Sequence, residues 1–277
     1  MSRSVKIISY NIQEGGSGRL SSIASVLRQQ EPDIVALLEA GNRANVEALA
    51  HELSMEIAFG EANTPIGHMA WLSRLPIHRA ENHRHPGLAK TLLEIEVNWA
   101  DVPLHLFATH LSSRWDPPEP VEEIPIILDL LRSLADQPHL LVGDFNALRP
   151  GDPVGPLPEG VEKRGDAADG APRDAIRLLL DAGYIDCYRA QHSQSPGYTY
   201  PSTRPWLRLD YIFASPPIAA SLHDCDIVNA DDAVTASDHL PIWAVFRQDE
   251  TYEGENPCRR AARSRREHSV GPAEQSF

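Results

Sequence analysis

The chain alternates short apolar runs with segments in which apolar residues recur every three or four positions. Val5 to Tyr10 is an apolar run of strand length, and apolar residues follow at positions 20, 23, 26 and 27. That spacing places four side chains on one face of a helix, which Pro32 ends before a second apolar run, Ile34 to Leu38. The chain is therefore predicted to open as strand, helix, strand, which carries Asn11 and Glu39 to neighbouring strand ends.

The same two patterns continue to about residue 246. The run from Leu92 to Val97 alternates apolar residues with two glutamates, as in a strand with two different faces. Helical spacing from Ile126 to Leu134 and from Ala175 to Leu180 predicts two further helices. Other strands are expected at 69–72, 104–109, 140–142, 209–214, 226–228 and 242–246. The order indicates two successive halves, each with a sheet and helices, and periodicity alone leaves α/β and α+β both open.

Polar side chains cluster at the edges of these predicted strands. A carboxylate such as Glu39 at the end of an apolar run is costly to leave unpaired, and a bound metal ion would compensate it. Asp144 and Asn146 are two positions apart, so both would project to one side if the strand continued through them. The six clusters are Tyr10-Asn11, Glu39, Thr109-His110, Gly143-Asp144-Phe145-Asn146, Arg208-Leu209-Asp210-Tyr211 and Ser237-Asp238-His239.

The 277 residues could form one large domain or two small ones. Because clusters near both ends of the chain are expected to share one site, we predict one domain over residues 1–248. Residues 249–277 have few apolar side chains and an Arg-rich patch at 259–266, which predicts a disordered tail. Residues 149–173 are rich in Gly, Pro and Asp, so they form either a loop that selects substrate or a solvated insertion.

The chain is acidic, with 39 Asp and Glu against 25 Lys and Arg and a net charge of −14. Proteins that bind nucleic acids usually carry a basic surface, because neutralising phosphates releases counterions. The charge therefore disfavours tight DNA binding, although carboxylates gathered around a metal would add to the acidic count. Nothing in the sequence points to a protein partner.

Three cysteines, Cys187, Cys225 and Cys258, are odd in number and form no close pair, so neither a disulfide framework nor a zinc site is expected. The first apolar run is too short for a signal peptide, and no stretch has the roughly 18 apolar residues of a membrane span. A cytoplasmic location is the expectation.

The order of the motifs ISYNI, LLEA, ATHL, VGDFNA, LRLDYIF and SDHLPI resembles that of the endonuclease/exonuclease/phosphatase superfamily. This group contains DNase I-like nucleases, abasic-site endonucleases, inositol polyphosphate 5-phosphatases, sphingomyelinases and deadenylases. The resemblance extends from about Val5 to Phe246. It implies an α+β fold, a four-layer α/β/β/α sandwich of two packed mixed sheets, with the site at the shared edge of the sheets.

The resemblance also implies a set of metal ligands. Glu39 corresponds to the principal ligand of Mg²⁺, with Mn²⁺ as the alternative ion, and Asn11 and Asp238 contribute oxygens directly or through water. Mg²⁺ typically keeps several waters and needs only one or two protein carboxylates in addition to a substrate phosphate, so this sparse set suffices.

The remaining motif residues correspond to the family's catalytic groups. Asp144 would orient and deprotonate the attacking water, and Asn146 would hold Asp144 or a phosphate oxygen. Asp210 would accept a hydrogen bond from His239, which either stabilises the developing negative charge or acts as the base instead. His110 would face the phosphate near the leaving oxygen.

Two departures from the family pattern concern the substrate. Leu38 stands where the family often has Gln, and the Tyr found mid-chain in abasic-site endonucleases has no clear counterpart. The leading hypothesis is a Mg²⁺-dependent phosphoesterase that hydrolyses a phosphodiester of DNA or RNA by in-line attack of water. The alternatives are a phosphatase or phosphodiesterase acting on a small or lipid phosphoester and, less favoured, a non-catalytic binding module with the same fold.

Overall fold

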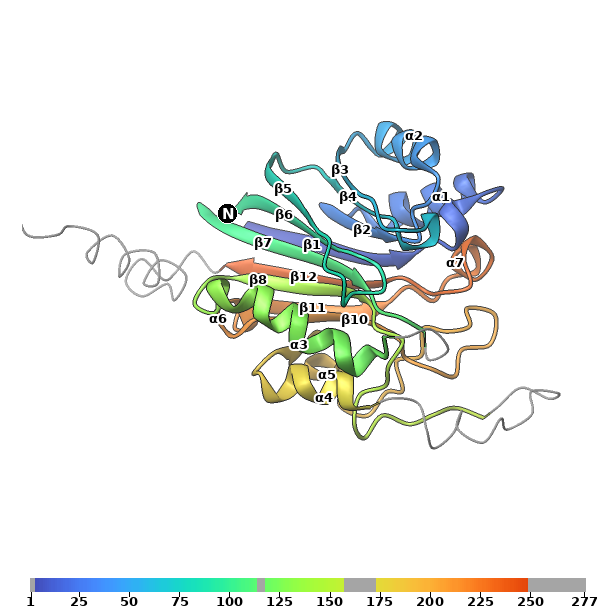
Figure 1. Cartoon of the computed structure of the whole chain (residues 1–277). Coiled ribbons are helices and arrows are strands. Elements are labelled where there is room, and N and C mark those ends of the chain that lie inside the picture. Colours follow the sequence, from blue (N-terminus) through green and yellow to red (C-terminus); the bar gives the residue numbers. More distant parts are fainter. Residues whose placement is uncertain (1–2, 114–117, 157–172, 249–277) are drawn as a thin grey trace, which may run out of the picture.

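The structure, a computed structural model, describes residues 3–113, 118–156 and 173–248. This part of the chain forms two six-stranded sheets with helices outside them (Figure 1). The predicted tail at 249–277 and most of the loop predicted at 149–173 lie outside the described residues. None of the described helices has the length and apolar character needed to cross a lipid bilayer.

The first sheet is built around β1 (Arg3–Asn11), the first apolar run of the sequence. β1 pairs in parallel with β2 (Ile34–Leu38) after the crossover helix α1 (Leu20–Gln30), as the opening pattern predicts. On its other side β1 pairs antiparallel with β12 (Ile242–Gln248), so the two ends of the described chain lie side by side. The strand order is β11-β12-β1-β2-β4-β3, completed by β3 (Glu56–Gly60), β4 (Met69–Ser73) and β11 (Leu222–Ile227).

The second sheet has the strand order β5-β6-β7-β8-β10-β9. β7 (Val102–His110) and β8 (His139–Asp144) are parallel neighbours, and β10 (Asp210–Ala214) runs antiparallel to β8. The remaining strands are β5 (Ile77–His83), β6 (Leu92–Trp99) and β9 (Ile185–Asp186).

Helices cover the outer face of each sheet and complete the four layers (Figure 1). α1, α2 (Arg43–Leu53) and α7 (Asp231–Ala236) pack on the first sheet. α3 (Pro120–Leu131) and α4 (Asp174–Asp181) pack on the second. Shorter helices are α5 (Cys187–Gln191), α6 (Pro216–Ala219) and three 3₁₀ turns, Glu14–Gly16, Pro65–Gly67 and Arg132–Leu134. The predicted α+β four-layer sandwich is confirmed.

Alternate residues of each central strand face the space between the two sheets. In β1, Val5 and Ile7 belong to the core between the sheets, whereas Ile8 and Tyr10 pack under the helices. In β8, Leu140 and Val142 lie between the sheets. Because side chains alternate with a period of two, polar residues that end these strands in the same register also point into the space between the sheets.

The division into two successive halves is wrong. The chain builds β1 to β4 in the first sheet and β5 to β10 in the second, and β11 and β12 then return to pair with β1. The predicted strand at 226–228 is instead Leu222–Ile227, and the helix expected around Ile126–Leu134 begins at Pro120 and ends at Leu131. The described cysteines, Cys187 and Cys225, are buried free thiols as expected, and Cys258 lies outside the described residues.

Candidate active site

The polar clusters converge at one end of the space between the two sheets. The carboxyl ends of the parallel pairs β1–β2 and β7–β8 meet there, together with the first residue of β10 and the turn before β12. Six of the eight predicted site residues are joined by contacts between their side chains, which span both sheets. They are Asn11, Glu39, His110, Asp144, Asp210 and His239.

Asn11 at the end of β1 connects the two sheets. Its Nδ2 donates to Glu39 Oε1 at 3.2 Å and to Asp144 Oδ2 at 3.3 Å, so two carboxylates from different sheets face one amide group. The Asn11 Oδ1 accepts from the backbone N–H of Gln13 at 3.0 Å. In this arrangement the Asn11 oxygen is engaged by the backbone, and its amide nitrogen faces the site.

Glu39 follows β2 in a left-handed backbone conformation, with φ of 54°. This conformation is uncommon for a residue with a Cβ atom and is held only where neighbouring contacts fix it. Two such contacts are visible: the Glu14 N–H donates to Glu39 Oε2 at 3.0 Å, and the Gly15 N–H donates to the Glu39 carbonyl at 2.7 Å. The fold therefore directs this carboxylate toward Asn11 instead of letting it turn away with the chain.

His239 lies between two buried aspartates. Its Nδ1 is 2.8 Å from Asp210 Oδ2, and its Nε2 is 3.7 Å from Asp144 Oδ2. Burial alone would lower the pKa of His239, but the charges of Asp210, Asp144 and Asp238, with the Asp210 hydrogen bond, raise it to about 10. The imidazole is thus held in its cationic form at neutral pH.

Asp144 is 2% exposed and ends β8. Burial and the nearby Asp210 charge raise the pKa of Asp144 to about 6, and the His239 charge and the Asn146 N–H act in the opposite direction. The residue before it must be glycine: a Cβ on Gly143, at φ of 148°, would lie 1.8 Å from the Thr109 carbonyl oxygen. This glycine lets β7 and β8 approach closely enough to align His110 with Asp144.

The strand does not continue through Asn146, so the condition under which Asp144 and Asn146 would project to one side is not met. Asn146 has φ of 46°, so the strand turns there. Its backbone N–H donates to Asp144 Oδ1 at 2.9 Å, while its side-chain Nδ2 donates to the Leu111 carbonyl at 3.0 Å. Asn146 therefore holds Asp144 through its backbone, and its side chain fixes the segment after β7.

His110 ends β7 and is 4% exposed. Its Nε2 is 3.4 Å from Asp144 Oδ2, which supplies the carboxylate neighbour that the sequence left unidentified. Burial, together with the positive charges of Lys90 and His239, lowers the pKa of His110 well below its usual value. The site thus places a neutral imidazole and a charged one near the same oxygen, Oδ2, of Asp144.

Asp238 and a residue that the motifs did not include, Tyr200, lie beside His239. The Tyr200 and His239 rings have centroids 4.8 Å apart. Burial and then the charges of Asp238, Asp144 and Glu39 raise the pKa of Tyr200, so three carboxylates of the site affect this hydroxyl. Tyr200 is in a loop with no periodic signal, and only its Tyr-Pro sequence marks a turn there.

Lys90 is a second residue absent from the motifs. Its Nζ donates to the Leu111 carbonyl at 2.8 Å, and its charge affects the pKa of both His110 and Asp144. Buried Glu123 on α3 accepts from the Ala89 and Ser112 N–H groups at 2.9 and 2.7 Å. It thereby links the loop that contains Lys90 to the segment that follows β7. Nothing in the periodicity could have assigned these roles.

A buried network of ion pairs lies next to the site, at the start of β10. Arg208 is 0% exposed; it donates to Asp152 Oδ2 at 2.7 Å and to both oxygens of Asp186 at 2.9 and 2.6 Å. Its guanidinium also stacks 4.4 Å from the Tyr211 ring. Because Arg208 precedes Asp210 by two residues, the network fixes the start of β10.

The buried carboxylates of the site fit a divalent cation. Asp144, Asp210 and His239 have ligand atoms that all lie within 4.8 Å of one another and all three are buried, but a cationic His239 has no free lone pair, so the two carboxylates are the donors of this group. Asp210 Oδ1 is buried without a hydrogen-bond partner among the described residues, which suits a position that a cation or water would complete. Glu39 and Asp238 fall outside such groups, and Glu39 reaches Asp144 through Asn11.

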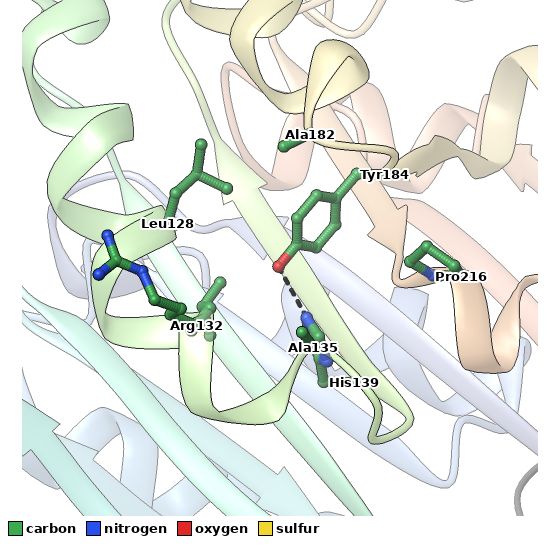
Figure 2. Close-up of a pocket in the computed structure, with 8 residues that line it drawn as sticks. Leu128, Arg132, Ala135, His139, Ala182, Tyr184 and Pro216 are labelled. Atoms are coloured by element: carbon green, nitrogen blue, oxygen red, sulfur yellow. Dashed lines mark hydrogen bonds between the residues drawn. The ribbon is translucent and has the colours of Figure 1, made fainter. Parts of the chain in front are cut away.

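A separate shallow pocket lies at the opposite end of β8, between α3 and the start of α6 (Figure 2). Figure 2 shows the Tyr184 ring directed at His139, whose Nε2 lies 2.7 Å from the Tyr184 hydroxyl. Burial lowers the pKa of His139. None of the predicted site residues lines this pocket.

The profile of the Endonuclease/Exonuclease/phosphatase family matches residues 8–239. The chain belongs to this family, whose members hydrolyse phosphoester bonds. No curated protein matches it in sequence.

Solved structures show the same fold at low sequence identity. An AP endonuclease from Archaeoglobus fulgidus is 22% identical with a TM-score of 0.68, covering 87% of this chain and 99% of its own. The 3′ phosphatase NExo from Neisseria, bound to a product DNA hairpin, is 20% identical with a TM-score of 0.70 and coverage of 87% and 99%. D. rerio TDP2, complexed with a single-strand DNA product, is 20% identical with a TM-score of 0.66 and coverage of 88% and 99%.

Proposed function

We propose that this protein is a Mg²⁺-dependent phosphoesterase that hydrolyses a phosphodiester or a terminal phosphate of DNA. The observation that carries the proposal is the position of Asp144 between a cationic and a neutral imidazole, next to the Asn11–Glu39 pair of the other sheet. An anionic ester needs positive charge and hydrogen-bond donors, which the two imidazoles and the Asn11 amide supply. The attacking water needs a base, which Asp144 supplies.

Asp144 is suited to accept the proton of the attacking water. A general base works best when its pKa lies near the operating pH, and the pKa of Asp144 is raised to about 6. Asn146 keeps the second oxygen of this carboxylate engaged at 2.9 Å, which leaves Oδ2 to face the site. Proton transfer to Asp144 would also relieve its repulsion with Asp210.

His239 would stabilise the negative charge that develops on the phosphoryl oxygens. Asp210 holds the Nδ1 side of the ring at 2.8 Å, so the Nε2–H is directed toward Asp144 and the position of the ester. His110, held neutral by burial, would donate to the leaving oxygen without adding a second fixed charge. The alternative role of His239 as the base has less support, since an imidazolium has no free lone pair.

Glu39 would be the principal ligand of the cation, with Asn11 and Asp238 acting through water. The Glu39 carboxylate lies 3.2 Å from the Asn11 amide nitrogen, and hard oxygen donors are those that Mg²⁺ and Mn²⁺ prefer. When bound, the ion would supply charge neutralisation and Lewis-acid polarisation of a phosphoryl oxygen.

DNA is favoured as the substrate because NExo and TDP2, which share the fold, were solved with DNA products. The net charge of −14 favours the second candidate, a small phosphoester that needs no extended basic surface. A panel that contains single-stranded and duplex DNA, RNA, 3′-phosphorylated oligonucleotides and small phosphoesters separates these two. Turnover of small esters with no turnover of any nucleic acid would overturn the DNA assignment.

The variant Asp144→Asn tests the chemistry itself. It keeps the shape of the side chain but removes the base, so turnover of the best substrate in the panel should fall by at least about 100-fold, the usual contribution of general base catalysis. Asp226→Asn is the matched control, because Asp226 is also near a histidine, at 3.8 Å from His192 Nε2, but lies outside the site. A wild-type rate in Asp144→Asn would contradict the mechanism, and a site without any turnover or Mg²⁺ uptake would indicate a binding module.

A further inference from the structure

A second cluster of metal-ligating side chains lies on the outer face of the second sheet, away from the active site. It consists of Glu81 and His83 on β5, Glu94 on β6 and His105 on β7, three adjacent strands in Figure 1. The neighbours of Glu94 in β6, Leu93 and Ile95, point into the core between the sheets, so Glu94 points to the opposite face.

The ligand atoms of this cluster are close together. His83 Nε2 lies 2.8 Å from Glu94 Oε2 and His83 Nδ1 lies 3.5 Å from Glu81 Oε1, so the imidazole has one carboxylate at each of its nitrogens and would hold an ion through only one of them. The ligand atoms of Glu81, His83 and Glu94 all lie within 4.8 Å of one another. Around a tetrahedral ion with bonds of about 2.0–2.2 Å, ligand atoms are about 3.3–3.6 Å apart, so small side-chain movements would complete the site.

The Glu81 and Glu94 carboxylates repel each other, and a bound cation would relieve this repulsion. Glu81 and Glu94 are directly opposite each other in the β5–β6 ladder, where like charges destabilise the pairing. Glu94 is also 3% exposed. Burial opposes its ionisation, but hydrogen bonds from His105 and His83 and the charge of Arg79 lower the pKa of Glu94 to about 2, so it is ionised at neutral pH.

We propose that Glu81, His83 and Glu94 form a site for a transition-metal ion of the Zn²⁺ class. Imidazole together with carboxylate is a donor set that Zn²⁺ accepts, and three protein ligands leave one position for water. His105 Nδ1, at 3.1 Å from Glu94 Oε1, would fix the carboxylate from its other oxygen.

Arg79 contacts the same carboxylates and would compete with a metal ion for them. It contacts the Glu81 carboxylate and lies 3.6 Å from Glu94 Oε1. Its side chain is 53% exposed, so it can swing into solvent at little cost when an ion binds. The site would therefore link the edge strand β5 to β6 and β7 and stabilise the fold, with no part in the hydrolysis.

The test is titration of the EDTA-treated full chain with Zn²⁺ by calorimetry, and with Co²⁺ by visible absorption. All variants are made in the Glu39→Gln background, because Glu39 is the proposed principal ligand of the active-site cation. In this background the chain should take up one equivalent, and the further change His83→Ala should abolish that uptake. His105→Gln should weaken binding by about 10- to 100-fold, the usual effect of removing such an orienting group. Arg79→Gln should bind several-fold more tightly, and because that side chain is exposed its folding is not at risk.

Three results in the Glu39→Gln background would overturn the site: no uptake, retention of the uptake after His83→Ala, or unchanged affinity after Arg79→Gln. Thermal unfolding in EDTA checks that each variant is folded. With Zn²⁺ at 100 times the dissociation constant, Glu39→Gln should gain about 2.7 kcal/mol of stability, and Glu39→Gln with His83→Ala should gain none.

Discussion

Replacing Asp210 by Asn removes the charge that holds His239 in its cationic form while keeping the shape of the side chain. In the native protein His239 Nδ1 lies 2.8 Å from Asp210 Oδ2, and both residues are buried. The pKa of His239 is raised from its ordinary 6.5 to about 10. We expect the variant to lose the imidazolium within the pH range in which the wild type is active.

The size of the effect follows from the charges around the ring. A rise in pKa from 6.5 to about 10 corresponds to a preference of about 5 kcal/mol for the cationic form. Of the three aspartates that raise this pKa, Asp210 has the largest effect. An opposite charge at such a distance usually shifts a pKa by about 1 to 3. In Asp210→Asn the pKa of His239 should therefore fall to between about 7 and 9.

The assay is the pH dependence of turnover, together with an NMR titration of the His239 ring. Wild type should lose activity only as the pH approaches about 10, where His239 loses its proton. In Asp210→Asn this alkaline loss of activity should occur at a pH lower by about 1 to 3. The control is Asp226→Asn, which removes an exposed carboxylate 3.8 Å from His192. An alkaline limb at the same pH in wild type and Asp210→Asn would refute the role given to His239.

Three further results are expected. The acid limb of turnover should have its midpoint near pH 6, because only ionised Asp144 can accept a proton; a rate constant down to pH 4 would contradict this. In urea unfolding, Gly143→Ala should cost about 1 to 3 kcal/mol more than Gly18→Ala, which has a positive φ but no atom within 4 Å of its Cβ; equal costs would contradict it. Arg208→Leu should cost about 3–5 kcal/mol, because buried Asp186 loses its closest charged partner and buried Asp152 loses one of its two arginines, against about 0–1 for the exposed Arg28→Leu; similar costs would indicate that Arg208 is not essential.

Strands with continuous apolar runs could be predicted from sequence, and most elements with a weaker pattern could not. β2, β4 and β8 are buried along their whole length, and the motifs that end β1, β2 and β8 carry part of the site. β5 and β3 were missed because they are edge strands with exposed residues. α2 was missed although Val46, Leu49, Ala50 and Leu53 have helical spacing, and no local pattern reveals that β12 pairs with β1 across the whole chain.

The motif residues were found, but their geometry depends on contacts that the sequence does not encode locally. Asn146 turns out of the strand with φ of 46°, so its backbone and not its side chain holds Asp144. Tyr200 and Lys90 reach the site from loops, where neither periodicity nor spacing marks a function. Asp152, which lies just after the predicted loop begins, is a buried partner of Arg208 and could be placed only by tertiary structure.

The most direct test of the central claim is single-turnover hydrolysis by EDTA-treated protein as Mg²⁺ is added back, with wild type and Glu39→Gln compared on the best substrate. The account predicts no hydrolysis before addition, full recovery in wild type with Mg²⁺ or Mn²⁺, and a loss of orders of magnitude in the variant at the same ion concentration. Hydrolysis that proceeds in EDTA, or a variant that recovers like wild type, would contradict a cation-dependent centre shared by the two sheets.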